Sequence, residues 1–496
     1  MTEGKGTKLE HTKQDSNIGF EFFRAADANP DFPAIIAEDI TLTYAQLKRV
    51  VEAFAWKMKQ AGVDQTSMII VETSDLVASV STLLASALLG AQYAYAGNFL
   101  ARAKVVKASH FFATTEATDL GGVDVVSIDQ SWSPHNVFKN NDALDTYEGY
   151  SSPDAPWLIT HTSGTTGFPK FISLSQRTVF DRSIAARADY VAHKTCFAPL
   201  FNCTARPFVS RALSALLSPC TIVDSRDASF FLKNGVNLVV GSPEQVKDIL
   251  APQRFGGKIP MLHCGGGKLE TSSIRQMLEN FDEVVDLYGS SETNRTFKNV
   301  HSLDSQGRVL SRGELLDSEL QIVDEQDELC DVDEPGVVRV RNGYLANGYL
   351  NNPEAQQRCF RGGWFYPGDL ARWGHNGELK IEGRTDDVVN LGGTKVNARI
   401  TENALRLAEG VQDAICFRNP KDNVVSELVA FVVLEPLTLV SDCLDRARNT
   451  CIRNLNPKSV PARIFRVDEI PVGPDGRPDR KKCETLVLAK FSEQQV

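Results

Sequence analysis

The stretch WLITHTSGTTGFPK, residues 157–170, joins an apolar run to a loop rich in glycine and hydroxyl side chains. The run WLIT predicts a buried strand. Two glycines, several hydroxyls and one cation together suit a polyphosphate, although a plain Gly/Thr turn between strands fits the same residues. The loop differs from GxxxxGK(S/T), because Lys170 lies three residues after Gly167 and a Phe follows it. The side chains that would contact the ligand are Thr162, Ser163, Thr165, Thr166 and Lys170.

Upstream of this loop, helical and strand patterns alternate. Apolar side chains in residues 42–63 recur at three- and four-residue steps and predict an amphipathic helix, and SMIIVE (67–72) predicts a strand. Residues 76–101 carry no charged side chain and are long enough to span a bilayer. Their scattered polar residues, and a change of composition near Gly90, favour a buried helix followed by a buried strand over a membrane span.

Downstream, several apolar strands end directly in turns. Examples are NLVVGS (237–242), MLHCGGGKL (261–269) and EVVDLYGSSE (283–292). This alternation predicts an α/β fold with parallel strands, whose carboxyl ends bind ligands. Short β-like pieces follow from about residue 310, and after GRTDD (383–387) a separate unit of about 110 residues begins. We therefore expect a large N-terminal α/β domain with several subdomains and a smaller, mobile C-terminal α+β lid.

Charge and cysteine usage narrow the function classes. The 496 residues include 53 Lys and Arg against 63 Asp and Glu, which gives a net charge of −10. That balance argues against a nucleic-acid partner or a polybasic membrane binder. The ten cysteines show neither zinc-like spacing nor a dense disulfide framework, and the N-terminus lacks the apolar run of a signal peptide. Reduced thiols and a cytoplasmic location are expected.

Two further motifs carry polar groups that suit a nucleotide, and the first of them follows the end of a predicted strand. Residues 288–292 (YGSSE) offer a ring for a base, a hydroxyl for a phosphate and the Glu292 carboxylate for Mg²⁺. In residues 363–370 (GWFYPGDL), Asp369 is suited to accept hydrogen bonds from ribose hydroxyls, and Arg384 further on is suited to donate to ribose or phosphate. Each also has a plainer interpretation. YGSSE can simply form a turn, Asp369 can cap a turn, and Arg384 can form an ordinary ion pair.

In this order and spacing, the three motifs resemble those of the adenylate-forming superfamily, which comprises acyl-CoA synthetases, peptide-synthetase adenylation domains and luciferases. The resemblance covers about residues 40–485. THTSGTTGFPK resembles the family's phosphate loop, YGSSE its YGxTE element, and GYLANGYLNNPEA a connector that follows. GWFYPGDLARWGHNGELKIEGRTDD resembles its ribose-binding and hinge stretch.

The resemblance implies a two-step reaction. A carboxylic acid and ATP form an acyl-adenylate and pyrophosphate, and the thiol of CoA, or of an acyl carrier protein, then takes the acyl group and leaves AMP. The resemblance assigns nucleotide binding to Thr162, Ser163, Thr165, Thr166, Tyr288, Gly289, Ser291, Asp369 and Arg384. It assigns catalysis to Lys170, Glu292 and Arg477, with Glu292 also holding Mg²⁺.

The resemblance also divides the chain. Asp386 falls at the family's hinge, so the predicted domains are an AMP-binding domain over residues 1–385 and a lid over residues 386–496. Gly392 and Gly393 would line the path of CoA, where small residues let a pantetheine arm approach the backbone. A hairpin turn explains the same two glycines.

The acyl pocket is expected between two segments. One contains Phe201 and Asn202, where the family often has a His, and the other contains residues 265–267, three glycines that leave room for the acid. An Asp that would meet an amino-acid amine is absent from the first segment, which disfavours amino-acid substrates. Lys268 is either a surface residue or a partner for a second carboxylate of the acid.

A sharper departure lies near the C-terminus. The family pattern PxTxxGKxxR reads PVGPDGRPDR in residues 471–480, so Arg477 stands where the family has its adenylation Lys. Either Arg477 substitutes, or Lys481 or Lys482 takes over, or the chain mainly passes a preformed acyl-adenylate to a thiol. A catalytically retired nucleotide-binding protein is the alternative from another class. The retained motif residues argue against it.

Overall fold

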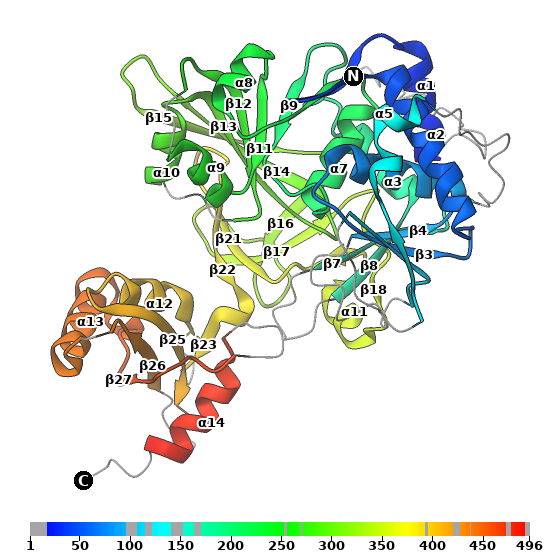
Figure 1. Ribbon diagram of the computed structural model, residues 1–496. Helices are drawn as coiled ribbons and strands as arrows, with labels where there is room; N and C mark the ends of the chain where they lie inside the picture. The colour runs from blue at the N-terminus through cyan, green and yellow to red at the C-terminus, as the bar shows by residue number, and fades with distance from the viewer. Residues whose placement is uncertain are drawn as a thin grey trace, which may run out of the picture.

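The computed structural model places a large N-terminal domain beside a smaller C-terminal domain, drawn in orange and red in Figure 1. This confirms the predicted fold class, while the boundary at residues 385 and 386 stays a prediction. The described residues are 17–95, 107–114, 122–139, 152–162, 170–251, 255–267, 269, 271–391, 395–419, 427–436, 438–472 and 478–491.

Helices α1 (Ile18–Ala28), α2 and α3 pack on one another and cover the seven-stranded sheet. The amphipathic pattern forms α2 (Tyr44–Gln60), which begins with a capping box between Thr43 and Gln46. The uncharged stretch forms α3 (Leu76–Leu89), all of whose residues are buried, followed by a strand as expected. In the described part of the chain, the longest apolar helices are too short to cross a membrane. The strand order is β18 (Tyr349–Leu350), β8 (Lys170–Ser175), β7 (Pro156–Thr162), β4 (Gln92–Tyr95), β3 (Met68–Glu72), β5 (His110–Ala113) and β6 (Asp124–Ser127).

The second sheet has nine strands, of which the central ones are parallel, as the alternating pattern predicts, while strands near both edges are antiparallel. The predicted strand–turn segments form its β11, β12 and β13. The order is β15 (Val309–Leu315), β14 (Asn294–Leu303), β13 (Phe281–Ser290), β12 (Ile259–Gly265), β11 (Leu238–Gly241), β9 (Cys196–Pro199), β10 (Thr221–Asp224), β1 (Pro33–Ala37) and β2 (Thr41–Thr43).

Helices of the N-terminal domain carry the apolar faces that pack on these sheets. Figure 1 shows α8, α9 and α10 around the second sheet and α1, α2 and α3 on the other side of the domain. The remaining bounds are η2 (Gln130–Trp132), α5 (Pro134–Val137), α6 (Gln176–Ala185), α7 (Arg206–Leu216), α8 (Ala228–Lys233), α9 (Pro243–Leu250), α10 (Thr271–Met277) and α11 (Pro353–Cys359).

The short β-like pieces after residue 310 build a third, antiparallel sheet, as their composition predicts. Its register sets Asp369 directly opposite Arg384. The strands are β19 (Phe360–Arg361), β20 (Trp364–Phe365), β17 (Gly336–Arg341), β21 (Asp369–Trp373) and β22 (Leu379–Arg384), with β16 (Glu319–Val323) paired to β17.

The C-terminal domain is α+β, as predicted. A three-stranded sheet has its own apolar core, and α12 and α14 both contact β25. The bounds are η3 (Thr385–Asp387), β23 (Val388–Asn390), β24 (Lys395–Asn397), α12 (Ala398–Arg406), β25 (Val411–Asn419), β26 (Glu427–Leu434), α13 (Val440–Asn454), η4 (Pro457–Ser459), β27 (Arg463–Arg466) and α14 (Arg480–Phe491).

Several predicted site residues lie outside the described residues. These are Ser163, Thr165, Thr166, Lys268, Gly392, Gly393 and Arg477, and for Thr162 and Asp386 only the backbone is described. Their roles stay predictions.

Candidate active site

A cavity of about 1540 Å³ opens where the carboxyl ends of β12 and β13 meet α7 and the third sheet. This is the edge at which α/β sheets bind ligands. Its lining includes residues from all the motifs whose side chains are described. The predicted site residues in it are Lys170, Phe201, Asn202, Gly265, Gly266, Gly267, Tyr288, Gly289, Ser291, Glu292, Asp369 and Arg384.

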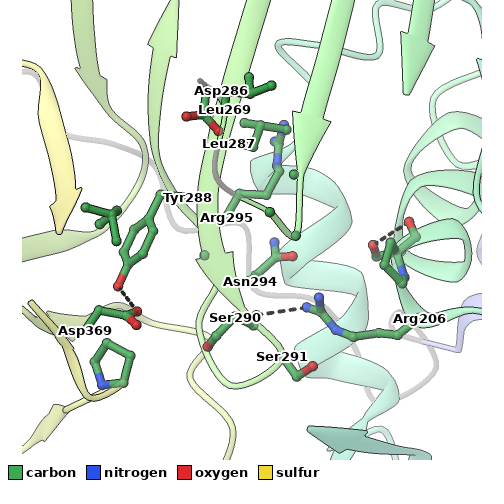
Figure 2. Close-up of a pocket in the computed structure, with 18 of the residues that line it drawn as sticks. Arg206, Leu269, Asp286, Leu287, Tyr288, Ser290, Ser291, Asn294, Arg295 and Asp369 are labelled. Carbon is green, nitrogen blue, oxygen red and sulfur yellow. Dashed lines mark hydrogen bonds between the residues drawn. The ribbon is translucent and has the colours of Figure 1, made fainter. Parts of the chain in front are cut away.

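Tyr288, Asp369 and Arg384 form one corner of the cavity. The Tyr288 hydroxyl donates to Asp369 Oδ2 at 2.6 Å, and Arg384 Nη1 donates to Asp369 Oδ1 at 2.7 Å. Figure 2 shows the Tyr288 side chain pointing from β13 toward Asp369. Burial, with the Asp369 charge, raises the pKa of Tyr288, so this hydroxyl remains a donor. The corner presents a fixed carboxylate and guanidinium, groups that suit ribose hydroxyls and phosphate oxygens.

The loop after Tyr288 is held in one shape by its own residues. Ser290 Oγ accepts hydrogen bonds from the backbone N–H groups of Glu292 and Thr293, each at 3.2 Å. At Gly289 the β13–β14 register shifts, and an added Cβ would lie 1.9 Å from the carbonyl oxygen of Asn294. Gly289 therefore permits a close backbone approach that aims Ser291 and Glu292.

Arg182, on α6, holds the same loop through hydrogen bonds to its backbone. Its guanidinium donates to the carbonyl oxygens of Ser291 (3.0 Å), Glu292 (2.8 Å) and Tyr344. The side chain is buried, and burial together with nearby Arg206 lowers its pKa to about 9. A guanidinium fork suits several converging carbonyls, so Arg182 is a positioning residue.

Lys170, Tyr349 and Glu292 form a second corner. The Tyr349 hydroxyl donates to Glu292 Oε1 at 2.6 Å, and Lys170 Nζ lies 5.0 Å from the centre of the Tyr349 ring. Lys170 is 8% exposed and Glu292 is 5% exposed. A buried cation and a buried carboxylate beside one cavity can bind phosphate oxygens and a divalent cation.

The other end of the cavity is lined by less polar groups. Phe201 and Leu269 line it together with residues 265–267, and their role as an acyl pocket stays a prediction. Asn202 also lines it, but its Oδ1 accepts from the backbone N–H and the hydroxyl of Thr204, at 2.9 and 2.8 Å. Asn202 thus stabilises the turn before α7.

Asp286 is a cavity residue that the motifs did not single out. It lies on β13, two residues before Tyr288, and Figure 2 places it at the upper edge of the site. Burial raises the pKa of its carboxyl to about 6. Among the described residues, no hydrogen bond to its carboxyl is found, so a ligand donor can reach it.

Tyr349 and three arginines, of which Arg182 is buried and two are partly buried, were not predicted from the sequence. Tyr349 lies within the GYLANGYLNNPEA connector, whose resemblance to the family was a signal for it. The arginines are Arg182, Arg206 and Arg211. Each is a single cation within a helix, and no local sequence signal distinguished these arginines from solvent-facing ones.

In the C-terminal domain, Arg480 ties the segment after the predicted hinge to the lid core. Its guanidinium pairs with Asp387 at 3.1 Å and Glu402 at 2.8 Å, and Nε donates to the carbonyl of Cys416 at 3.0 Å. Burial raises the pKa of Glu402, and Arg480 opposes that effect. Arg480 thus anchors the start of α14, just after the segment that contains Arg477.

Curated relatives align with nearly the whole chain. Surfactin synthase subunit 1 of Bacillus subtilis is 25% identical over 525 residues, covering 98% of this chain but only 14% of the relative. Indoleacetate–CoA ligase of Aromatoleum aromaticum is 26% identical, covering 95% of this chain and 98% of the relative. The chain therefore spans a small part of some relatives and nearly all of others.

Solved structures share the fold, and one family description matches the N-terminal domain. The O-succinylbenzoate coenzyme A synthetase of Bacillus subtilis, in complex with AMP, has a TM-score of 0.76 at 19% identity, covering 93% of this chain and 97% of that chain. Residues 22–350 match the family described as AMP-binding enzyme. Because that match extends over more than half of the residues of this chain, the chain belongs to the AMP-binding enzyme family.

Proposed function

We propose that the chain is an acid–CoA ligase that works through an acyl-adenylate. The observation that carries this proposal is that two anion-binding corners and an apolar pocket share one cavity. A carboxylate oxygen attacks the α-phosphorus of ATP, and the bond to the β-phosphate breaks to release pyrophosphate. The CoA thiolate then attacks the acyl carbon, and the bond to AMP breaks. Catalysis rests on positioning and charge neutralisation.

The nucleotide roles follow from the two corners. Asp369 would accept from the ribose hydroxyls and Arg384 would donate to ribose or phosphate, while Tyr288 orients Asp369 through its 2.6 Å hydrogen bond and offers its ring to the adenine. Lys170 would donate to the β- and γ-phosphates. Ser291, held by Arg182 through its carbonyl, would meet the α-phosphate.

Glu292 fits the requirement for Mg²⁺. Among the described residues, no group of three or more His, Cys, Asp or Glu side chains gathers into a metal cage. Mg²⁺ is commonly held by one or two carboxylates together with substrate phosphates, and Glu292 beside Lys170 matches that donor set. The ion would neutralise charge on the phosphate oxygens.

A second candidate keeps the same site but omits the first step. Arg477 in place of the family's Lys favours an enzyme that passes a preformed acyl-adenylate to CoA, because a guanidinium is bulkier and less point-like than an ammonium. An acyl carrier protein would present the same pantetheine thiol. We place either reaction in the cytoplasm, which the ten free cysteines support.

The test is the dependence of AMP release on all three substrates. A panel of carboxylic acids would be incubated with ATP, Mg²⁺ and CoA, and AMP and thioester would be quantified together. The proposal expects equal amounts of both, lost in the Glu292→Gln variant and retained in Asp282→Asn, which changes an exposed carboxylate on β13, the strand that precedes Glu292. AMP formed independently of any acid would contradict it.

A further inference from the structure

Helix α7 carries two arginines into the wall of the cavity. Arg206 Nη2 donates to the carbonyl oxygen of Ser290 at 3.1 Å, and Arg211 Nη1 donates to that of Pro207 at 2.9 Å. The Arg211 guanidinium also lies 5.3 Å from the centre of the Phe201 ring, in the acyl pocket. Figure 2 shows Arg206 reaching toward Ser290. Most donors of these two groups remain open to a ligand.

Three arginines, Arg206, Arg211 and Arg295, gather in this part of the cavity lining, where the Glu292 carboxylate acts on Arg206. Within the described ranges, neither Arg206 nor Arg211 forms an ion pair. Asp189, the buried carboxylate whose charge acts on Arg211, is already paired with Arg295. His263 adds no further positive charge, because burial lowers its pKa to about 3 and leaves it neutral.

Both guanidinium groups are only partly exposed, and withdrawing such cations from water is unfavourable unless an anion meets them. Burial, with smaller contributions from neighbouring arginines, lowers the pKa of Arg211 to about 10, so it stays charged at neutral pH. A chain with a net charge of −10 that concentrates unpaired guanidinium groups here is arranged to bind an anion.

The start of α7 adds to the positive character. Ala205, its N-cap residue, makes no side-chain capping hydrogen bond, and both Ala205 and Arg206 line the cavity. Uncapped N–H groups and the helix dipole favour an anion there. Arg211 lies five residues further along, which is about 7.5 Å along the helix axis. Two anionic groups of one ligand can therefore bind at separate points.

Resting on the proposed acid–CoA ligase activity, we propose that the acid carries a second carboxylate, which Arg211 binds in the acyl pocket. Its reacting carboxylate lies at Arg206 and the N-terminus of α7, next to Ser291. Dicarboxylic acids are then the substrate class, and Arg211 selects them over neutral-tailed acids. If both arginines instead served only the nucleotide phosphates, the acid's tail would not affect binding through Arg211.

The test compares each dicarboxylic acid with its own monoamide. Succinate, glutarate, adipate, pimelate, suberate and the three benzenedicarboxylates, with their monoamides, would be titrated calorimetrically into the full chain saturated with AMP. We expect at least one diacid to bind about tenfold more tightly than its monoamide, a preference of about 1.4 kcal/mol. If every monoamide binds as tightly as its diacid, the proposal is overturned.

Variants assign the preference to Arg211. Arg211→Met should reduce it to less than about twofold with little change in monoamide affinity, and Arg211→Lys should retain most of it. The matched control is Lys380→Met, which removes an exposed cation that also lines the cavity, and which should leave the preference intact. A preference that survives Arg211→Met overturns the assignment. The wild-type comparison stands even if that variant fails to fold.

Pyrophosphate release, measured separately, distinguishes this proposal from the proposed function. Arg211-dependent diacid binding without any turnover would sink the ligase proposal and leave the anion site. Turnover of neutral-tailed acids, without preferential binding of diacids, would overturn the anion site and leave the ligase proposal.

Discussion

The Tyr349 hydroxyl donates a 2.6 Å hydrogen bond to Glu292 Oε1, across 57 residues of sequence. It joins β18, at the edge of the first sheet, to the loop after β13 in the second. Burial and the adjacent Glu292 carboxylate raise the pKa of Tyr349, so the hydroxyl keeps its proton and fixes the carboxylate beside Lys170. One contact thereby sets the proposed metal ligand relative to the proposed phosphate cation.

Replacing Tyr349 with Phe should lower both the stability of the fold and the apparent affinity for magnesium. Loss of a hydrogen bond to a buried carboxylate should lower the free energy of unfolding by about 1.5–3 kcal/mol. The Mg²⁺ concentration for half-maximal pyrophosphate release should rise several-fold, because Glu292 loses its orientation. Tyr344→Phe is the control, since that hydroxyl donates to the carbonyl of Asp317 at 2.8 Å. Equal magnesium dependence in both variants would contradict this role for Tyr349.

Gly289→Ala should abolish AMP binding and lower stability, whereas Gly343→Ala should do neither. The new Cβ would lie 1.9 Å from the carbonyl oxygen of Asn294, so the backbone of the site loop must move. We expect loss of AMP binding and a denaturant midpoint well below that of the wild type. Gly343→Ala, whose Cβ meets nothing within 4 Å, should change stability by less than about 0.5 kcal/mol. Normal AMP affinity in Gly289→Ala would show that the loop tolerates the displacement.

Asp286→Asn should stabilise the chain in a pH-dependent way. Burial raises the pKa of Asp286 from 3.8 to about 6, so the folded state holds this proton more tightly than the unfolded state. Its contribution to stability is present below about pH 4 and is lost as the pH rises to about 6. The variant should therefore gain up to about 3 kcal/mol over wild type above pH 6, and little at pH 4.

Tryptophan fluorescence during urea unfolding, repeated across this pH range, measures that difference. Asp282→Asn, on the exposed side of the same strand, should change stability by less than about 0.5 kcal/mol at each pH. A pH-independent effect of Asp286→Asn would mean that burial does not perturb the carboxyl as described.

Arg480→Met should destabilise the C-terminal domain, and adding Glu402→Gln should partly restore its stability. The substitution leaves the buried Glu402 carboxylate with the backbone N–H of Cys416 at 2.9 Å but without its guanidinium partner. Breaking a buried pair from one side costs about 3 kcal/mol, so amide exchange in α12 and β25 should accelerate about 100-fold. Adding Glu402→Gln removes the stranded charge. Exchange in the double variant as fast as in Arg480→Met alone would disprove this coupling.

The site residues within the local motifs could be predicted from the sequence. Those that lie far from the motifs in sequence and meet them only in the folded chain could not. Tyr288, Glu292, Asp369 and Arg384 could be found because strand periodicity and turn residues are local signals, and the structure places all four in one cavity. The β21–β22 register then makes Asp369 and Arg384 direct neighbours.

The remaining site residues depend on tertiary packing. Arg182 donates to the carbonyl of Glu292, 110 residues away in sequence, a contact set by how α6 packs against α7 and the β7–β8 pair of the first sheet. Arg211 lines the cavity only because α7 turns one face to it. In sequence alone each is a single cation in a helix, and nothing local distinguishes it from a solvent-facing residue.

The most direct measurement compares the two half-reactions on the same preparation. Acid-dependent exchange of labelled pyrophosphate into ATP reports adenylation, and thioester formation from a synthetic acyl-adenylate and CoA reports transfer. An acid–CoA ligase should show both, and Arg477→Lys should raise exchange while leaving transfer unchanged. Transfer without exchange would restrict the chain to the second step, and the absence of both, with every acid and adenylate in the panel, would contradict the ligase proposal.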